Sequence, residues 1–364
     1  MSHPENFFSA SYEEARARFL EASRREGGAH QSFVNDRARG MAEETLTCDA
    51  VWHGPEDAEA VLVTLSATHG AEGFCGSGVQ LGTLASGEAS GLPEKTALLQ
   101  IHAINPYGFS WLRRVTEDNV DLNRNFLRHG EEPYPGNRGY EELHGILCPR
   151  EWNDAVIAAT NRELMAYADR HGRLALQSAI SGGQYEHPDG LFYGGREATW
   201  SNRTLIGILT GYLGGAKRVA LIDYHTGLGP RGHGERICAA APGGPGHARA
   251  EAFYDGDITS PFLGTSASVP LHGVNLTAIE AALPHCEVTA VALEYGTIPT
   301  EEVKLALRAD NWLHQHGDPA GEKGKAIKQQ IRAAFYQDAA DWKEAVWERA
   351  LETQRLALSG LWAG

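Results

Sequence analysis

The stretch that decides the fold is residues 60–73, Ala-Val-Leu-Val-Thr-Leu-Ser-Ala-Thr-His-Gly-Ala-Glu-Gly. Its first part is apolar or small, with Val and Leu prominent, and predicts a buried strand. The strand leads into a glycine-containing turn that holds His69 and Glu72. An imidazole and a carboxylate at this spacing can converge on one divalent metal, and zinc accepts both kinds of ligand. Because a catalytic zinc needs three protein ligands, the pair predicts a third ligand elsewhere in the chain.

Composition indicates an ordinary globular protein. The chain has 364 residues, of which 42% are hydrophobic and 22% charged, which is enough for one large α/β domain or two smaller ones. The formal net charge is -15 and no run of Lys and Arg is present, so neither nucleic acid nor an anionic membrane surface is expected as a partner.

The N-terminal sequence and the cysteine usage both predict a cytoplasmic location. The first residues lack the basic and apolar regions of a secretory signal, and no stretch approaches the roughly 18 apolar residues that cross a bilayer. The 5 cysteines are odd in number and form no Cys-x-x-Cys pair, as expected for reduced thiols. We therefore expect a cytoplasmic protein.

Hydrophobic periodicity predicts strands that alternate with helices. A capping-box pattern at residues 11–14 opens the first helix, which ends near residue 26. Strands are predicted at residues 45–53, 60–67, 97–104, 218–224 and 288–295. Further helices are predicted at residues 77–86, 151–171, 201–213, 301–314, 325–335 and 340–358. Residues 126–150 and 177–195 are interpreted as irregular, and long irregular segments often form the walls of a site. The alternation predicts an open, mostly parallel or mixed sheet covered by helices.

The predicted strand at residues 218–224 supplies a third ligand, because it leads to His225 in a glycine-containing turn. Ligands of open α/β sheets bind at the carboxyl ends of strands, where His69, Glu72 and His225 would all lie. Glu294 also closes an uncharged run, and a buried carboxylate is costly without a partner. Taken singly, His225 could be a hydrogen-bonded core histidine and Glu294 a strand-end ion-pair partner. Their shared position at strand ends favours one common site.

A resemblance to a known family enters at residues 105–126. This segment contains Asn-Pro-Tyr-Gly-Phe, then Arg114, then Val-Asp-Leu-Asn-Arg-Asn-Phe at residues 120–126. It resembles the zinc metallocarboxypeptidases, whose pattern is Asn-Pro-Asp-Gly, an Arg, and Val-Asp-Leu-Asn-Arg-Asn-Phe. The order of motifs across residues 69–294 is also that of the family, and the surrounding segments resemble a bacterial branch of it.

The resemblance implies a fold and a domain organisation. The fold would be a three-layer α/β/α arrangement with a central mixed, roughly eight-stranded sheet. A single catalytic domain would span residues 1–364. An N-terminal helix at about residues 11–26 and a helical C-terminal segment at about residues 300–360 would pack on it.

The resemblance also implies a metal centre with one Zn²⁺ per chain. His69, Glu72 and His225 match the zinc ligands. Asp121 matches the carboxylate that orients a ligating histidine. Glu294 matches the general base that takes a proton from the zinc-activated water.

Three more residues match groups that bind the substrate. Arg114 matches the arginine that stabilises the negative oxygen of the tetrahedral intermediate. Asn123 and Arg124 match the pair that holds the terminal carboxylate of the substrate, for which the planar fork of Arg is suited. The chain departs from the family pattern at Tyr107, where the family has Asp, and at Asn119, where it has Gly. The family's substrate-contacting tyrosine has no clear match in the sequence, and Tyr193 and Tyr254 are candidates for it.

These observations favour a zinc hydrolase that removes a C-terminal residue from a peptide or related amide. The alternative is a deacylase of the aspartoacylase or succinylglutamate desuccinylase type, which cleaves small N-acyl amino acids. Asn123 and Arg124 would serve either enzyme, since both substrates carry a carboxylate. A metal-binding homologue without catalysis is a third possibility, and the oligomeric state stays open.

Overall fold

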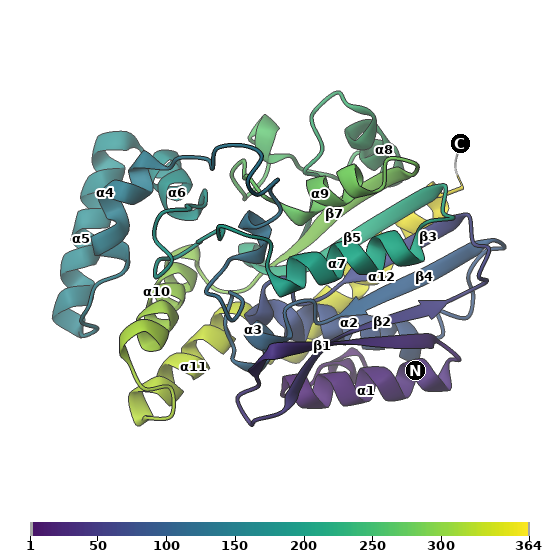
Figure 1. Ribbon diagram of the computed structural model, residues 1–364, viewed down its shortest axis with the longest axis horizontal. Helices are drawn as coiled ribbons and strands as arrows, with labels where there is room; N and C mark the ends of the chain where they lie inside the picture. Colours follow the sequence, from purple (N-terminus) through teal and green to yellow (C-terminus); the bar gives the residue numbers. More distant parts are fainter. Residues whose placement is uncertain (1–2, 363–364) are drawn as a thin grey trace.

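The computed structural model describes residues 3–362, and its centre is a seven-stranded mixed sheet (Figure 1). The strand order is β1-β2-β4-β3-β5-β7-β6. The strands are β1 (Ala29–Arg39), β2 (Thr45–His53), β3 (Ala60–Leu65), β4 (Thr96–His102), β5 (Arg218–Arg231), β6 (Gly234–Ile237) and β7 (Glu287–Gly296). The four central strands, β4, β3, β5 and β7, run parallel, and β1, β2 and β6 join antiparallel at the two sides. The seven strands found within residues 3–362 agree with the mixed sheet of roughly eight strands that the resemblance implies.

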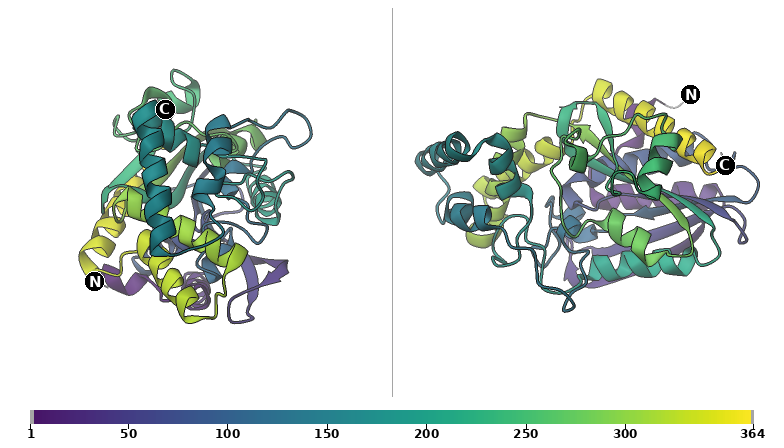
Figure 2. Two further views of the ribbon diagram at one scale, coloured as in Figure 1. Left: turned by 90° about the vertical axis from the view of Figure 1, so that its left-hand side faces the viewer. Right: turned by 90° about the horizontal axis from the view of Figure 1, so that it is seen from above.

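Helices cover both faces of this sheet, which confirms the three-layer α/β/α class (Figures 1 and 2). One face packs against α1 (Tyr12–Arg25), α2 (Gly73–Ala85) and α12 (Ala340–Gly360). The other face packs against α7 (Trp200–Tyr212) and α9 (Asn275–Ala282). The remaining helix near the sheet, α8 (Pro245–Phe253), packs on β7 and α12. Each face therefore buries an apolar layer of its own.

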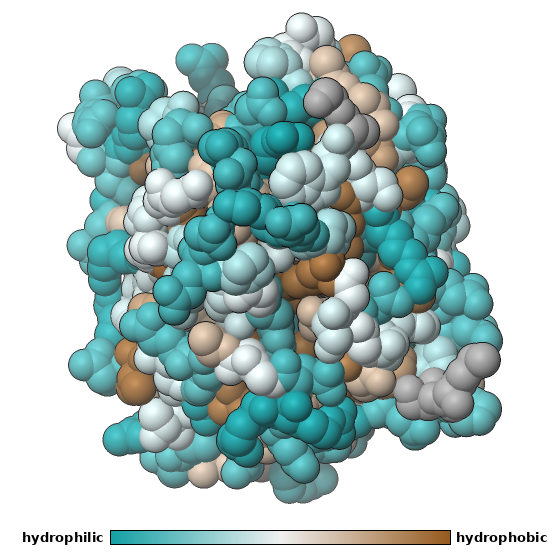
Figure 3. Space-filling view, turned by 90° about the vertical axis from the view of Figure 1, so that its right-hand side faces the viewer, coloured by the Kyte–Doolittle hydropathy of each residue, from teal (hydrophilic) through white to brown (hydrophobic). Residues whose placement is uncertain are grey.

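The other helices gather at one end of the sheet, on the left in Figure 1. They are α4 (Arg138–Leu147), α5 (Asp154–His171), α6 (Arg173–Ser181), α10 (Thr300–His316) and α11 (Glu322–Phe335). The opposite end is largely hydrophilic, with scattered hydrophobic areas (Figure 3). Within residues 3–362, no helix combines the length and the apolar character that a bilayer crossing requires.

Short elements connect the strands to the site. They are η1 (Pro4–Phe7), η2 (Gly70–Glu72), α3 (Pro106–Ser110), η3 (Leu122–Arg124) and η4 (Pro261–Leu263). The parallel register of β5 and β7 sets His225 directly beside Glu294. The sheet thereby brings together residues that are far apart in the sequence.

Some elements differ from the sequence-based expectation. The segment 126–150 is only partly irregular, because α4 occupies its second half, and α6 covers the start of 177–195. The edge strand β1 is not predicted, because most of its side chains are exposed and it therefore lacks an apolar face. The short strand β6 and the helices α8 and α9 are also not predicted.

Candidate metal centre

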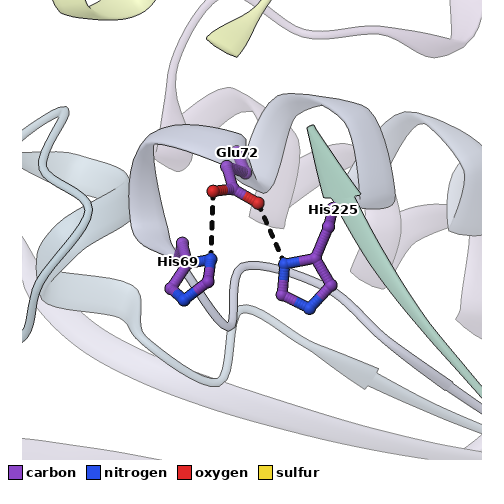
Figure 4. A group of neighbouring side chains, drawn as sticks. All are labelled: His69, Glu72 and His225. Carbon is purple, nitrogen blue, oxygen red and sulfur yellow. Dashed lines mark hydrogen bonds and ion pairs between the residues drawn. The ribbon is translucent and has the colours of Figure 1, made fainter. Parts of the chain in front are cut away.

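Three buried side chains from β5, η2 and the turn before η2 converge at the end of the sheet (Figure 4). The donor atoms of His69, Glu72 and His225 all lie within 4.8 Å of one another. Nδ1 of His69 is 3.0 Å from Oε1 of Glu72, and Nδ1 of His225 is 3.0 Å from Oε2 of Glu72. Two imidazole nitrogens thus face the two oxygens of one carboxylate, which is a donor set that suits zinc.

The turn between β3 and α2 holds His69 and Glu72 on the same side. Its backbone bends at Ala67, whose φ of 59° lies in the left-handed region. At Gly70 a Cβ atom would lie 1.9 Å from the carbonyl carbon of Gly108, so only glycine fits. This close approach holds η2 against α3 and so fixes the position of Glu72 relative to His69.

A second carboxylate holds the outer nitrogen of each histidine. Nε2 of His69 is 3.1 Å from Oδ1 of Asp121, and Nε2 of His225 is 2.8 Å from Oδ2 of Asp223. Each Nε2–H can donate to its aspartate, which leaves the Nδ1 lone pair free to face Glu72. Zinc-binding histidines are usually held in this way. The donor set and its orientation therefore fit the metal that the sequence predicts.

Asp223 is absent from the sequence-based prediction, although a signal for it exists. It precedes His225 by two residues in β5, and residues two apart in a strand point to the same face. Oγ1 of Thr68 and Nδ2 of Asn275 also donate to Asp223, at 2.8 and 2.6 Å. These bonds fix the aspartate in place, so that it can hold the histidine.

Charges in the centre are closely coupled. Burial opposes ionisation of Glu72, but the neighbouring His69 and His225 outweigh it and hold the pKa of this carboxyl far below its usual value. Burial also lowers the pKa of His225, yet Asp223 and Glu72 raise it well above normal. The carboxylates around His225 therefore favour positive charge beside it, as they would favour a bound dication.

Arg114 borders the centre on one side. Its Nε donates to Oδ2 of Asp121 at 2.8 Å, and its Nη1 donates to Oε1 of Glu72 at 3.1 Å. The guanidinium lies over the ring of Phe192, 5.2 Å from the ring centroid. Its position is therefore fixed by two carboxylates and one aromatic ring.

Glu294 lies at the end of β7, beside His225. Its Oε1 accepts a hydrogen bond of 3.0 Å from the backbone N–H of Leu228. Burial and the negative charge of Glu72 raise the pKa of Glu294 to about 8. A dication held by the three donors would oppose the charge of Glu72 and so lower this pKa.

These groups surround one cavity of about 160 Å³. Its polar lining includes every predicted site residue except Asp121, which lies behind His69: His69, Glu72, Arg114, Asn123, Arg124, His225 and Glu294. Much of the remaining wall is apolar. Neither Tyr193 nor Tyr254 belongs to the lining, so the structure gives no support to either as a substrate-contacting tyrosine.

Arg124 is a buried cation with unused donors. Its Nε and Nη2 donate to the carbonyl oxygen of Ser181 at 3.2 and 2.5 Å, and its Nη1 donates to that of Asn123 at 2.8 Å. A guanidinium has five N–H groups, so about two remain. The nearest carboxylate oxygen, Oδ1 of Asp121, is 3.9 Å away, and burial lowers the pKa of Arg124. A buried cation with free donors in a cavity is suited to an anionic ligand.

The side chain of Asn123 is held in the wall of the cavity through its amide oxygen. Its Oδ1 accepts a hydrogen bond of 3.1 Å from the backbone N–H of Asn275, and its Nδ2 lies 3.5 Å from Nε2 of His225. The amide nitrogen is the part of this side chain that remains available to a ligand in the cavity.

Sequence comparison assigns the chain to a family. The model of the family described as "Protein of unknown function (DUF2817)" matches residues 8–349. The chain belongs to this family. No curated protein matches the sequence.

Comparison with solved structures finds, among others, three proteins of different descriptions. Bovine thrombin-activatable fibrinolysis inhibitor, in complex with tick carboxypeptidase inhibitor, is 10% identical with a TM-score of 0.45, over 96% of this chain and 99% of that one. Carboxypeptidase A from Helicoverpa armigera is 13% identical with a TM-score of 0.43, over 89% and 74%. A protein assigned by its description to the succinylglutamate desuccinylase/aspartoacylase family, from Shewanella amazonensis, is 18% identical with a TM-score of 0.36, over 79% and 72%.

Proposed function

We propose that this protein is a zinc-dependent amide hydrolase that cleaves a bond close to a terminal carboxylate. The observation that carries the proposal is the buried cluster of His69, Glu72 and His225, with Glu294 lining the same cavity. These three side chains would hold the metal. When bound, zinc supplies a Lewis acid that polarises the scissile carbonyl and makes water more acidic.

Glu294 would act as the general base. The Leu228 N–H fixes one of its carboxylate oxygens and leaves the other free to take a proton from water. The same oxygen can then deliver this proton to the leaving nitrogen. Positioned acid–base groups of this kind contribute about 10²- to 10⁴-fold to rates.

Arg114 and Arg124 would each bind one negatively charged group of the reacting substrate. Arg114 adjoins Glu72 and would stabilise the negative oxygen that develops on the carbonyl. Arg124 would bind the carboxylate of the substrate through its remaining N–H groups, a pairing to which its planar fork is suited. The substrate class is therefore an amide that carries a carboxylate on its leaving group.

Two substrate types meet this description: peptides with a free C-terminus and N-acyl amino acids. The motif at residues 120–126 favours the first. The unused N–H groups of the buried Arg124 suit the carboxylate of either type. Turnover of blocked dipeptides compared with that of N-acetyl amino acids separates the two.

Replacement of Glu294 by Gln tests the proposal. The Glu294→Gln variant keeps the shape of the side chain but cannot take the proton, so we expect kcat to fall by about 10²-fold or more with the zinc content unchanged. Kinetics and metal analysis on the same preparation measure both quantities. Glu287→Gln, in the exposed first position of β7, is the matched control and should behave as wild type. Full activity of the Glu294→Gln variant would contradict the assignment.

A further inference from the structure

A second cavity, with a volume of about 320 Å³, lies beside the catalytic one. It lies between α5, α6 and α10, in the group of helices at the left of Figure 1. Its apolar lining includes Leu147, Leu164, Met165, Leu176, Leu191 and Leu305. We call it the side cavity.

The side cavity and the catalytic cavity share part of their walls. Ile180, Phe192 and Leu307 line both, as does Lys304. Side chains thus contribute to both cavities at their boundary, and side chains can change rotamer without a change in the fold. A chain-like group could therefore extend from one cavity into the other.

The two cations that line the side cavity, Lys304 and Arg308, are already engaged by other residues. Nζ of Lys304 lies 3.2 Å from a carboxylate oxygen of Glu301. Arg308 is buried and donates to the carbonyl oxygens of Ile146 and Leu147 and to Oδ1 of Asn161. A polar ligand would have to compete with these contacts, whereas an uncharged apolar ligand would not.

The shared wall lies next to the arginines of the catalytic cavity. Ile180 precedes Ser181, whose carbonyl oxygen accepts from Arg124, and the ring of Phe192 lies against Arg114 and Arg124. A substrate held by these arginines would therefore lie next to the apolar side cavity. We propose that the side cavity binds an uncharged aliphatic chain of the substrate, an inference that rests on the proposed function.

Phe192 stands at the boundary between the two cavities. Its ring lies 5.2 Å from the guanidinium of Arg114 and 5.6 Å from that of Arg124. Its φ of 52° is unusual for a bulky residue, and such backbone strain persists only where the surroundings enforce it. A chain that passes this ring contacts the same side chain that supports both arginines, so its binding would also order the catalytic groups.

Calorimetry with the zinc-loaded Glu294→Gln variant tests the proposal, because this variant allows binding to be measured without turnover. The probes are N-acetylglycine, N-hexanoylglycine and N-decanoylglycine. Each buried methylene should lower the Kd by up to about fourfold until the cavity is full. A second series carries chains of the same lengths on the amino-acid side of N-acetyl amino acids, and the series that shows the gain is used with the variants below. A Kd that does not depend on chain length in either series would overturn the proposal.

A substitution at the rim of the side cavity tests whether the aliphatic chain binds there. Met165 lines the side cavity but is 46% exposed, so Met165→Trp should fold and block the cavity. We expect Met165→Trp to lose the increase in affinity with chain length and to keep the Kd of N-acetylglycine. Leu174→Trp, on α6 at a 69% exposed position outside the lining, is the matched control and should keep the gain. Retention of the gain by Met165→Trp, or equal loss in both variants, would refute the location.

The test separates this inference from the proposed function. With Glu294 present, hydrolysis of N-acetylglycine or blocked dipeptides tests the function, and its absence for every amide tried would overturn the function. The chain-length series is read in the variant that lacks Glu294 and tests only the side cavity.

Discussion

Each histidine of the metal centre lies between two carboxylates. His69 is held between Glu72 and Asp121, and His225 between Glu72 and Asp223. A carboxylate on the outer nitrogen fixes the tautomer and ring orientation and makes the inner nitrogen a stronger ligand. We therefore expect the two aspartates to contribute to metal affinity although neither touches the metal.

Asp223→Asn tests this arrangement at a single residue. The amide keeps the size of the carboxylate and can still accept a hydrogen bond, but it lacks the charge. We expect zinc affinity to fall by about 10- to 100-fold, as for other outer partners of metal ligands. Competition with a chromophoric chelator measures it, with the exposed Asp57→Asn as control. An unchanged affinity would show that the contact between Asp223 and His225 has no part in metal binding.

Single residues also show how far the sequence predicts the site. Apart from Asp121, the residues named from motifs line one cavity, because strand-end position and motif order are visible in the sequence. Their catalytic roles remain proposals. Phe192 is not predicted, because its contact with Arg114 and Arg124 depends on how distant loops pack. Asp223 could have been found from its spacing to His225, yet an aspartate in a strand has many other uses.

At the scale of elements, a strong local sequence signal is enough to predict a helix. The capping box at Ser11 predicts α1, and Ser11 does cap it by accepting a bond from the backbone of Glu14. The strand β1 has no such signal, because its exposed side chains carry no apolar alternation. The helix α4 lies in a segment rich in Gly and Pro, whose composition is typical of loops.

The contact between η2 and α3 makes a prediction about Gly70. A Cβ at this position would meet backbone atoms of Gly108 and Phe109, which cannot move aside as a side chain can. We expect Gly70→Ala to destabilise the fold by about 1–3 kcal/mol, the usual cost of overpacking. We also expect it to weaken zinc binding, because it displaces His69 from Glu72.

Denaturant unfolding with and without zinc measures both effects of Gly70→Ala. The control is Gly207→Ala in α7, where a Cβ has open space and should stabilise the helix by about 0.5–1 kcal/mol. Equal behaviour of the two variants would mean that the close approach of η2 and α3 does not determine the geometry of the site.

For the whole molecule, the class of fold follows from the alternation of strands and helices. The family resemblance implies roughly eight strands, and the sheet of residues 3–362 has seven. Which edge segments find a partner is not visible in the sequence. The same sheet brings His69, His225 and Glu294 to one end, although more than half of the chain separates the first from the last. The group of helices around α5 then encloses the side cavity next to this end.

The central claim is that this fold assembles a zinc site from two distant segments of the chain, one with His69 and Glu72 and the other with His225. The most direct test is the zinc content of the purified full-length chain, measured by metal analysis after dialysis against a zinc-free buffer. The account predicts one tightly bound zinc per chain in the wild type and almost none when both His69 and His225 are replaced by Ala. A wild-type protein without zinc, even after zinc has been added and the excess removed, would contradict it. Full zinc content in the double variant would contradict it equally.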